Sequence, residues 1–153
     1  MSRRDLIHMT AEEVDAFLHQ RHTMNIATHN HDGSIHLVAM WYGFVDGDVA
    51  FETFAKSQKV QNLRRDRRMT VLVEAGDSYD QLRGVEMVGT ADVVDDRDHL
   101  MAVARDVIGR YQPEVAGDDL EAAAEMMVRK RVAIRFHAER VVSWDHRKLA
   151  GGY

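Results

Sequence analysis

The chain has 153 residues, of which 45% are apolar and 29% are charged, and this balance is typical of a single globular domain covering residues 1–153. It contains no cysteine, which excludes disulfide bonds, a thiolate nucleophile, cysteine-ligated zinc and iron–sulfur clusters. A net charge of −5 argues against a broadly basic nucleic-acid-binding protein, and the lack of a secretory signal or of an apolar run of about 20 residues predicts a cytoplasmic protein with no membrane span.

A capped helix is the first predicted element. Thr10 and Glu13 have the spacing of a capping box, in which each side chain accepts a hydrogen bond from a backbone N–H group near the other. Apolar residues follow at helical spacing, so the sequence predicts a helix over residues 11–20.

Three strands joined by two glycine-containing turns come next. Strands are predicted over residues 23–29, 34–42 and 48–54, and the turns contain Gly33 and Gly47, where glycine supplies the positive φ of a tight hairpin. Because short turns join strands that pair with each other, we expect these three strands to form an antiparallel meander.

The second of these strands has two different faces. Alternate residues form an apolar stripe that is expected to face the core, namely Ile35, Leu37, Ala39 and Trp41. The residues between them form a more mixed face, which either belongs to the core or forms the floor of a pocket for a flat aromatic ring, namely Ser34, His36, Val38, Met40 and Tyr42.

A basic segment with a short helix follows the third strand. Ser57 is a favourable N-cap, and the apolar residues after it predict a helix within residues 56–66. Residues 53–68 carry one carboxylate, that of Asp66, and six cationic side chains, those of Lys56, Lys59, Arg64, Arg65, Arg67 and Arg68. Unpaired N–H groups and the helix dipole suit the start of such a helix to a phosphate, whereas a solvated basic surface is the alternative interpretation.

The second half of the chain predicts three further strands and two helices. The strands cover residues 69–74, 84–94 and 131–144, the last with an irregularity near His137, and the helices cover 97–111 and 118–128. Six strands in mostly consecutive hairpins predict a mainly β (α+β) fold, a six-stranded antiparallel split β-barrel with short flanking helices, because a barrel covers the edges that an open sheet leaves exposed. The tail around Trp144 to Lys148 either packs on this barrel or forms a lip over a ligand pocket, including a neighbouring subunit's pocket.

The histidines do not predict a metal site. His29, His31 and His36 are close in sequence, but a turn separates them, and no His-Glu-x-x-His pattern occurs. No Gly-x-Ser-x-Gly elbow is present either, which disfavours a hydrolase triad.

Several short motifs occur in a characteristic order along the chain. They are Ile26-Ala-Thr28, Asp32-Gly33, Ala39-Met-Trp-Tyr42, Phe51-Glu-Thr53, Lys56-Ser-Gln-Lys59, Asn62-Leu-Arg-Arg-Asp66, Val71-Leu-Val-Glu74 and Ser143-Trp-Asp-His-Arg-Lys-Leu149. This order resembles the pyridoxamine-phosphate-oxidase-like split-barrel superfamily over about residues 10–149, and it is most similar to the branch that uses the deazaflavin coenzyme F420. Arg67 departs from the pattern, because the family often has proline at this position.

The resemblance implies an FMN-binding-type split barrel that forms a homodimer with two cofactor sites at the subunit interface. The positions that it assigns to cofactor binding are His36, Val38, Met40, Thr53, Ala55, Lys56, Ser57, Lys59 and Asn62. Among them, Lys59 matches the phosphate-binding lysine, Thr53 and Ala55 border the cofactor tail, Asn62 supports the loop, and the three residues of the second strand line the ring.

The implied function is an oxidoreductase that transfers a hydride between F420 and a small electrophilic substrate. In such enzymes the cofactor supplies the reactivity and the protein positions it. An FMN-dependent oxidoreductase of the same fold is one alternative, and a non-catalytic carrier of the cofactor or of haem is another. A nucleic-acid module is disfavoured because no aromatic residue lies among the cations between Phe54 and Tyr79. No residue is identified as a catalytic acid or base.

Overall fold

A computed structural model describes residues 2–149 of the chain. In this part of the chain the strands are β1 (Met24–His29), β2 (Ile35–Met40), β3 (Gly43–Val45), β4 (Asp48–Phe54), β5 (Arg68–Ala75), β6 (Arg83–Val94) and β7 (Arg131–Asp145). The helices are α1 (Arg3–Leu6), α2 (Ala11–His19), α3 (Gln58–Arg65), α4 (Arg97–Tyr111) and α5 (Gly117–Met127), with short 3-10 helices η1 (Tyr79–Gln81) and η2 (His146–Leu149). Among the described residues, no helix combines the length and the apolar character that crossing a membrane requires.

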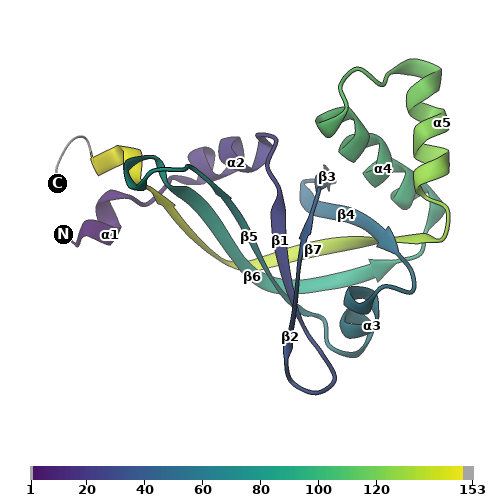
Figure 1. Cartoon of the computed structure of the whole chain (residues 1–153), viewed down its shortest axis with the longest axis horizontal. Coiled ribbons are helices and arrows are strands. Elements are labelled where there is room, and N and C mark those ends of the chain that lie inside the picture. The colour runs from purple at the N-terminus through teal and green to yellow at the C-terminus, as the bar shows by residue number, and fades with distance from the viewer. Residues whose placement is uncertain (1, 150–153) are drawn as a thin grey trace.

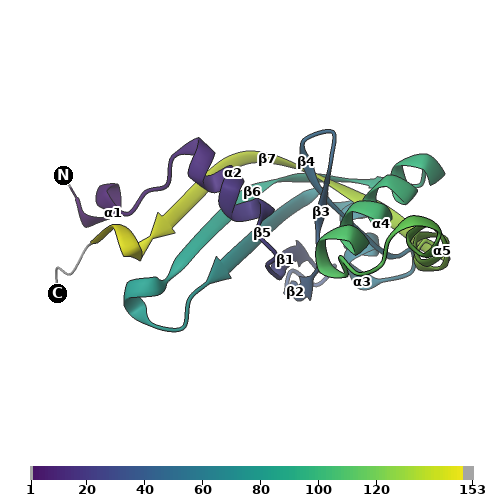
Figure 2. The same ribbon diagram turned by 90° about the horizontal axis from the view of Figure 1, so that it is seen from above.

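The strands form one antiparallel sheet that curls into a half-barrel. Their order across the sheet is β2-β1-β5-β6-β7-β4-β3. Figure 1 shows the long strands β6 and β7 running the length of the molecule, with α4 and α5 at one end and α1 at the other. Seen from above in Figure 2, α2 lies over the middle of β5 and β6, whereas α4 and α5 cover the far end of the sheet. The architecture confirms the predicted antiparallel, mainly β fold.

The interior is divided into two apolar clusters by the sheet. The larger cluster fills the inside of the curl and joins Phe17 of α2 to Ile26 of β1 and Phe51 of β4. The smaller one lies between the sheet and the helix pair α4–α5, and it includes Ala50 of β4. Neighbouring residues of β4 therefore face different cores, because successive side chains of a strand point to opposite faces.

The prediction of six strands is wrong, because the sheet has seven. The expected strand 34–42 ends at Met40, and a separate strand, β3, begins at Gly43. Between them Tyr42 is fully buried, and its hydroxyl donates a hydrogen bond to the Leu18 carbonyl at 2.5 Å. Burial of this large side chain turns the backbone out of the strand, so the chain leaves one edge of the sheet and re-enters at the other.

The expected meander is also wrong, for the same reason. The two hairpins exist as predicted, since β1 pairs with β2 and β3 pairs with β4. However, β2 and β3 lie at opposite edges of the sheet. Asp46 and Gly47 both have positive φ, 54° and 83°, as the tightest hairpin turn requires.

The apolar stripe of β2 does not face the core in this chain. Ile35 is 54% exposed, Leu37 is 67% exposed and Trp41 is 46% exposed, so the expected core face is the outer face of the half-barrel. The mixed face turns inward instead. Ile35 and Leu37 thus form a row of exposed apolar side chains on an edge strand of the sheet.

The irregularity predicted near His137 is confirmed as a β-bulge. Val88 pairs with Arg140 while Gly89 pairs with Ala138, which leaves Glu139 without a partner across the ladder. Gly89 is required there, because a Cβ atom at this position would lie 2.0 Å from the His137 carbonyl oxygen. The predicted helices agree closely with α2, α4 and α5, whereas α1 has no counterpart in the prediction.

Candidate functional site

The start of α3 lies directly against the end of β4. Ser57 is the N-cap of α3, but its hydroxyl does not cap the helix and instead lies 3.5 Å from the Thr53 hydroxyl. The first backbone N–H groups of a helix have no acceptor within it, and they carry the positive end of the helix dipole. The short segment that joins β4 to α3 therefore presents free backbone N–H donors and two hydroxyl groups close together.

Lys59 is a buried cation in this segment. The residue is 7% exposed, and its ammonium group donates to Thr53 Oγ1 at 3.1 Å. Within residues 2–149 it has no carboxylate partner, and burial together with the charge of Arg131 lowers the pKa of Lys59. A buried ammonium with unused donors and no counter-ion is suited to a bound anion.

Arg131 is a second cation at this site, which the sequence analysis missed. It is the first residue of β7, where it pairs across the ladder with Phe54 of β4, and its guanidinium lies 4.3 Å from the centre of the Phe54 ring. The carbonyl of the preceding residue, Lys130, accepts a hydrogen bond from the Ala55 N–H group at 2.9 Å. The only sequence signal for Arg131 is the basic run Arg129-Lys-Arg131 before the last strand, since the pairing of β4 with β7 joins segments far apart in the chain.

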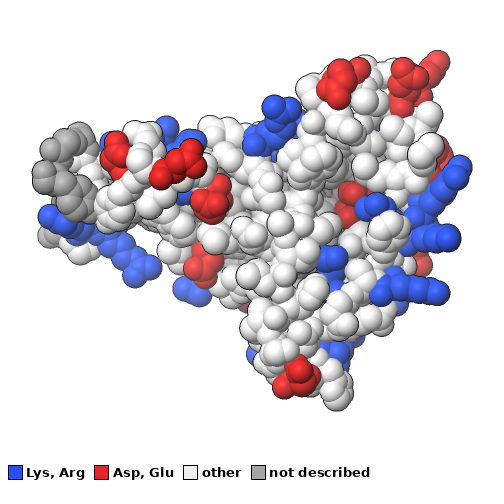
Figure 3. Space-filling model, viewed as in Figure 1, with Lys and Arg blue, Asp and Glu red and all other residues white. Residues whose placement is uncertain are grey.

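The predicted tail-binding residues lie around this point with different exposures. Thr53 is buried, Ala55 and Ser57 are half-buried, and Lys56 is exposed. Figure 3 shows Lys and Arg side chains along the edge of the molecule between α5 and α3, with few acidic side chains among them. An anion approaching this edge meets a positive surface before it reaches the buried Lys59.

The predicted ring-lining residues share the concave face of the sheet with the contacts of α3. His36, Val38 and Met40 are half-buried and pair across β1 with Thr28, Ile26 and Met24. Cross-strand partners project from the same face of a sheet, and these three residues of β1 are buried in the curl. The structure therefore brings the inner face of β2 and the start of α3 to the same side of the half-barrel.

Asn62 connects these two parts. It is fully buried, and its amide donates to Thr28 Oγ1 at 3.1 Å and to Asn30 Oδ1 at 2.9 Å. Its carbonyl oxygen accepts a hydrogen bond from Gln58 at 2.9 Å. These bonds fix α3 on the β1–β2 hairpin.

Replacing Asn62 with alanine is expected to lower the free energy of unfolding by about 1–3 kcal/mol, because the Thr28 hydroxyl would stay buried without this donor. Urea denaturation measures the loss. Gln61→Ala is the matched control, since Gln61 lies on the same helix but is exposed, and a change of no more than about 0.5 kcal/mol is expected there. Equal losses in the two variants would contradict the bridging role of Asn62.

An open hollow of about 500 Å³ adjoins this region. It is lined by Thr23, Ala39, Met40, Trp41, Glu52, Met127 and Arg131. Glu52 precedes Thr53 on β4 and was missed as a site residue by the sequence analysis. It is 6% exposed, and burial raises the pKa of its carboxyl group although Arg131 lies 3.3 Å away.

The raised pKa of Glu52 predicts how stability depends on pH. Between the usual pKa near 4.5 and the raised value in the folded state, the folded protein binds more protons than the unfolded chain. The cost of burying the ionised carboxylate is therefore relieved, and the free energy of unfolding rises, as the pH falls through that window. We expect the difference in unfolding free energy between wild type and Glu52→Gln to shift in favour of wild type as the pH falls from 7 to about 4.5.

Urea denaturation at a series of pH values measures this difference. Glu86→Gln is the control, because Glu86 also faces an arginine, Arg140 at 3.8 Å, but its side chain is 37% exposed. A pH dependence of the same size in both variants would contradict the assignment to Glu52.

Two other segments are occupied by structural contacts. Arg147 pairs with Asp145, and Lys148 binds Glu13 and the His8 carbonyl, so the tail packs on its own chain up to Leu149. Residues 150–153 of the tail lie outside the described residues. Between residues 2 and 149 no three His, Asp or Glu side chains gather in a way that could hold a metal ion.

Comparisons with known proteins agree with this architecture. The sequence matches the family described as pyridoxamine 5'-phosphate oxidase over residues 10–145. A conserved hypothetical protein of Mycobacterium tuberculosis, Rv2991, has a crystal structure that is similar with 43% identity and a TM-score of 0.91, covering 97% of this chain and 92% of that one. A comparison with curated proteins gives no significant match.

Two more distant structures share the fold. An F420 reductase is 20% identical with a TM-score of 0.61, covering 83% of this chain and 94% of its own. The haem storage protein HutZ from Vibrio cholerae is 12% identical with a TM-score of 0.65, covering 87% of this chain and 94% of its own. At these identities the likeness concerns the scaffold alone.

Proposed function

The chain belongs to the pyridoxamine 5'-phosphate oxidase family, and we propose that it is an oxidoreductase that binds coenzyme F420 and transfers a hydride between it and a small electrophilic organic substrate. The observation that carries this proposal is Lys59. A buried ammonium group without a carboxylate partner in the described chain, next to two hydroxyl groups and a helix start, fits the phosphate of such a cofactor.

The residues present also fit the ring of the cofactor. Val38 and Met40 offer apolar surface on the inner face of β2, and His36 adds a polar group on the same face. The backbone of β2 has β1 on one side only, so its outer N–H and C=O groups remain available to a ring with polar edges. The ring would thus be held by β2 and the phosphate by α3, and the hydrogen bonds of Asn62 fix α3 on the β1–β2 hairpin.

In this proposal the protein binds and orients, while the reduced deazaflavin supplies the hydride when it is bound. Lys59, Ser57 and the first N–H groups of α3 would hold the phosphate and so fix one end of the cofactor. The inner face of β2 would contact the ring at the other end. Alignment of two reactants in this way contributes much of the rate of a two-substrate reaction.

We further propose that two copies of the chain pair through the outer face of β2. Ile35 and Leu37 are exposed there, and a second copy is an occupant whose complementary surface is the same apolar row. Pairing would cover an edge strand that is otherwise open to solvent. It would also bring a second copy next to β2, whose inner face lines the proposed ring site.

The same geometry leaves two alternatives for the ligand and its use. FMN has a phosphate and a three-ring system as well, so the proposed site at Lys59 would suit either cofactor. A carrier that holds the cofactor or haem without turnover would use the same pocket. The motifs resembling the F420-using branch are the reason to place F420 first.

Titration of the purified protein with F420 and, separately, with FMN tests the proposal. We expect saturable F420 binding with a dissociation constant at least tenfold below that of FMN, followed by oxidation of reduced F420 with one of a panel of unsaturated acceptors. Tighter binding of FMN than of F420 would identify FMN as the cofactor instead. Binding without turnover in the whole panel would favour the carrier.

A further inference from the structure

The hollow beside β2 contains a buried polar atom, Oε2 of Glu52, that has no hydrogen-bond partner among residues 2–149. Apolar and aromatic groups make up most of its lining, including Trp41, Met40 and Met127. Among the lining residues, Glu52 and Arg131 are the charged ones. Polar groups that are few and well placed in an apolar pocket determine how a ligand is oriented.

The two oxygens of Glu52 have different environments. Oε1 lies 3.3 Å from a guanidinium nitrogen of Arg131. Oε2 is buried and has no hydrogen-bond partner among the described residues. A buried acceptor without a donor lowers the stability of the unliganded protein. Such atoms are rare unless a ligand or a water molecule donates a hydrogen bond to them.

The position of Glu52 is fixed by its surroundings. Its neighbours on β4 are paired with β7, and Arg131 is held by its contact with the Phe54 ring. The Arg131 guanidinium therefore contacts Oε1 of Glu52 and the Phe54 ring at the same time, and Oε2 of Glu52 remains available to another donor. Side chains on strands hold ligand groups more rigidly than side chains on loops.

We propose that Oε2 of Glu52 accepts a hydrogen bond from an N–H or O–H group at the edge of a flat ligand bound in this hollow. Trp41 and Met127 would flank the ligand, and Met40 would join the hollow to the inner face of β2. The inference rests on the proposed function. The donor group belongs either to the ring of the cofactor or to the substrate that lies against it, and both have the same chemistry at Glu52.

Binding and kinetics of two variants, Glu52→Gln and Glu52→Ala, separate these sources. A donor on the cofactor ring predicts that Glu52→Ala weakens F420 binding ten- to hundredfold in a fluorescence titration. A donor on the substrate predicts F420 binding within twofold of wild type and a KM for the acceptor raised by at least tenfold with kcat little changed. Glu52→Gln keeps one acceptor oxygen and is expected to lose less in either case.

A purely structural role of Glu52 is distinguished by stability. Glu52→Gln removes the desolvated charge while keeping the size of the side chain, so the melting temperature of this unliganded variant should stay level or rise while its ligand affinity falls. Glu86→Gln is the matched control and should bind as wild type does. Affinity and KM within twofold of wild type in Glu52→Ala would overturn the inference.

The test remains decisive if wild type binds neither F420 nor FMN, an outcome that would overturn the proposed function. Lumichrome, a flat three-ring imide without a phosphate, then serves as the probe. Weaker lumichrome binding by Glu52→Ala than by wild type would support the hydrogen bond at Glu52 without the phosphate site. Equal binding by both proteins, or none by either, would overturn it.

Discussion

Replacing Lys59 with methionine is expected to weaken F420 binding by about ten- to hundredfold, because a hydrogen bond between a buried ammonium group and a phosphate is worth about 1.5–3 kcal/mol. Lys59 is 7% exposed, and within residues 2–149 its ammonium group keeps donors beyond its bond to Thr53. A fluorescence titration of the cofactor measures the change. Arg64→Met is the matched control, since it removes one positive charge from the same helix at an exposed position and should change affinity less than threefold.

The same variant should not destabilise the unliganded protein. Burial lowers the pKa of Lys59 below its usual value of 10.5, so in the window between the two values the unfolded chain binds more protons than the folded one. Wild type therefore gains stability relative to Lys59→Met as the pH rises through that window, and at neutral pH the variant should unfold at the same or a higher urea concentration. Loss of stability without loss of affinity would show that Lys59 is structural.

Replacing Leu37 with glutamate is expected to convert the proposed dimer into monomers of 17.5 kDa. The new carboxylate would have to leave water in each half of a symmetric interface, which should weaken association by at least about a hundredfold. Analytical ultracentrifugation measures the mass, and a cofactor titration of the same sample shows whether binding falls as the copies separate. Such a fall is expected, because the outer and inner faces of β2 would serve the interface and the ring site respectively.

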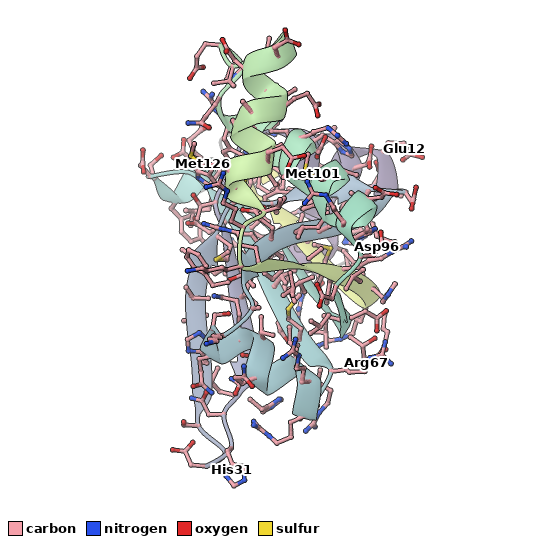
Figure 4. The ribbon with its side chains drawn as sticks, turned by 90° about the vertical axis from the view of Figure 1, so that its right-hand side faces the viewer. Glu12, His31, Arg67, Asp96, Met101 and Met126 are labelled. Carbon is pink, nitrogen blue, oxygen red and sulfur yellow. The ribbon has the colours of Figure 1, made fainter. Side chains whose placement is uncertain are left out.

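Met126→Glu is the control for this experiment. Met126 is 67% exposed, as Leu37 is, but it lies on α5, far from the β1–β2 hairpin that ends near His31 (Figure 4). This variant should keep the mass and the affinity of wild type. A wild-type protein that sediments as a monomer at micromolar concentration would contradict the dimer, and equal effects of the two variants would contradict its placement on β2.

Local signals in the sequence were sufficient for most elements. Helix α4 has the predicted bounds, and α2 begins at the residue after Thr10, because a cap and a helical repeat act within a few residues of each other. The hairpins at Gly33 and Gly47 formed as expected since the turn residues themselves require positive φ. The start of α3 was found for the same reason, and Lys59 and Ser57 lie within the segment that the local pattern indicated.

Contacts between distant segments were not predictable in this way. Alternation along β2 defines two faces of the strand, but it does not determine which face lies inside the half-barrel. The direction in which the sheet curls decides this, and it leaves the face of Ile35 and Leu37 outside. Arg131 reaches the site because β7 pairs with β4, across a long stretch of intervening chain.

The amino-acid sequence, read by itself, determines the helices, the hairpins, the lack of cysteine chemistry and the basic strand-to-helix segment that holds Lys59, because each depends on neighbours within about ten residues. The tertiary structure alone determines the seventh strand, the outward orientation of Leu37, the burial of Lys59 and the contact between Glu52 and Arg131. These features depend on strand order and on burial, which are set by contacts between segments far apart in the chain and cannot be inferred from any single segment.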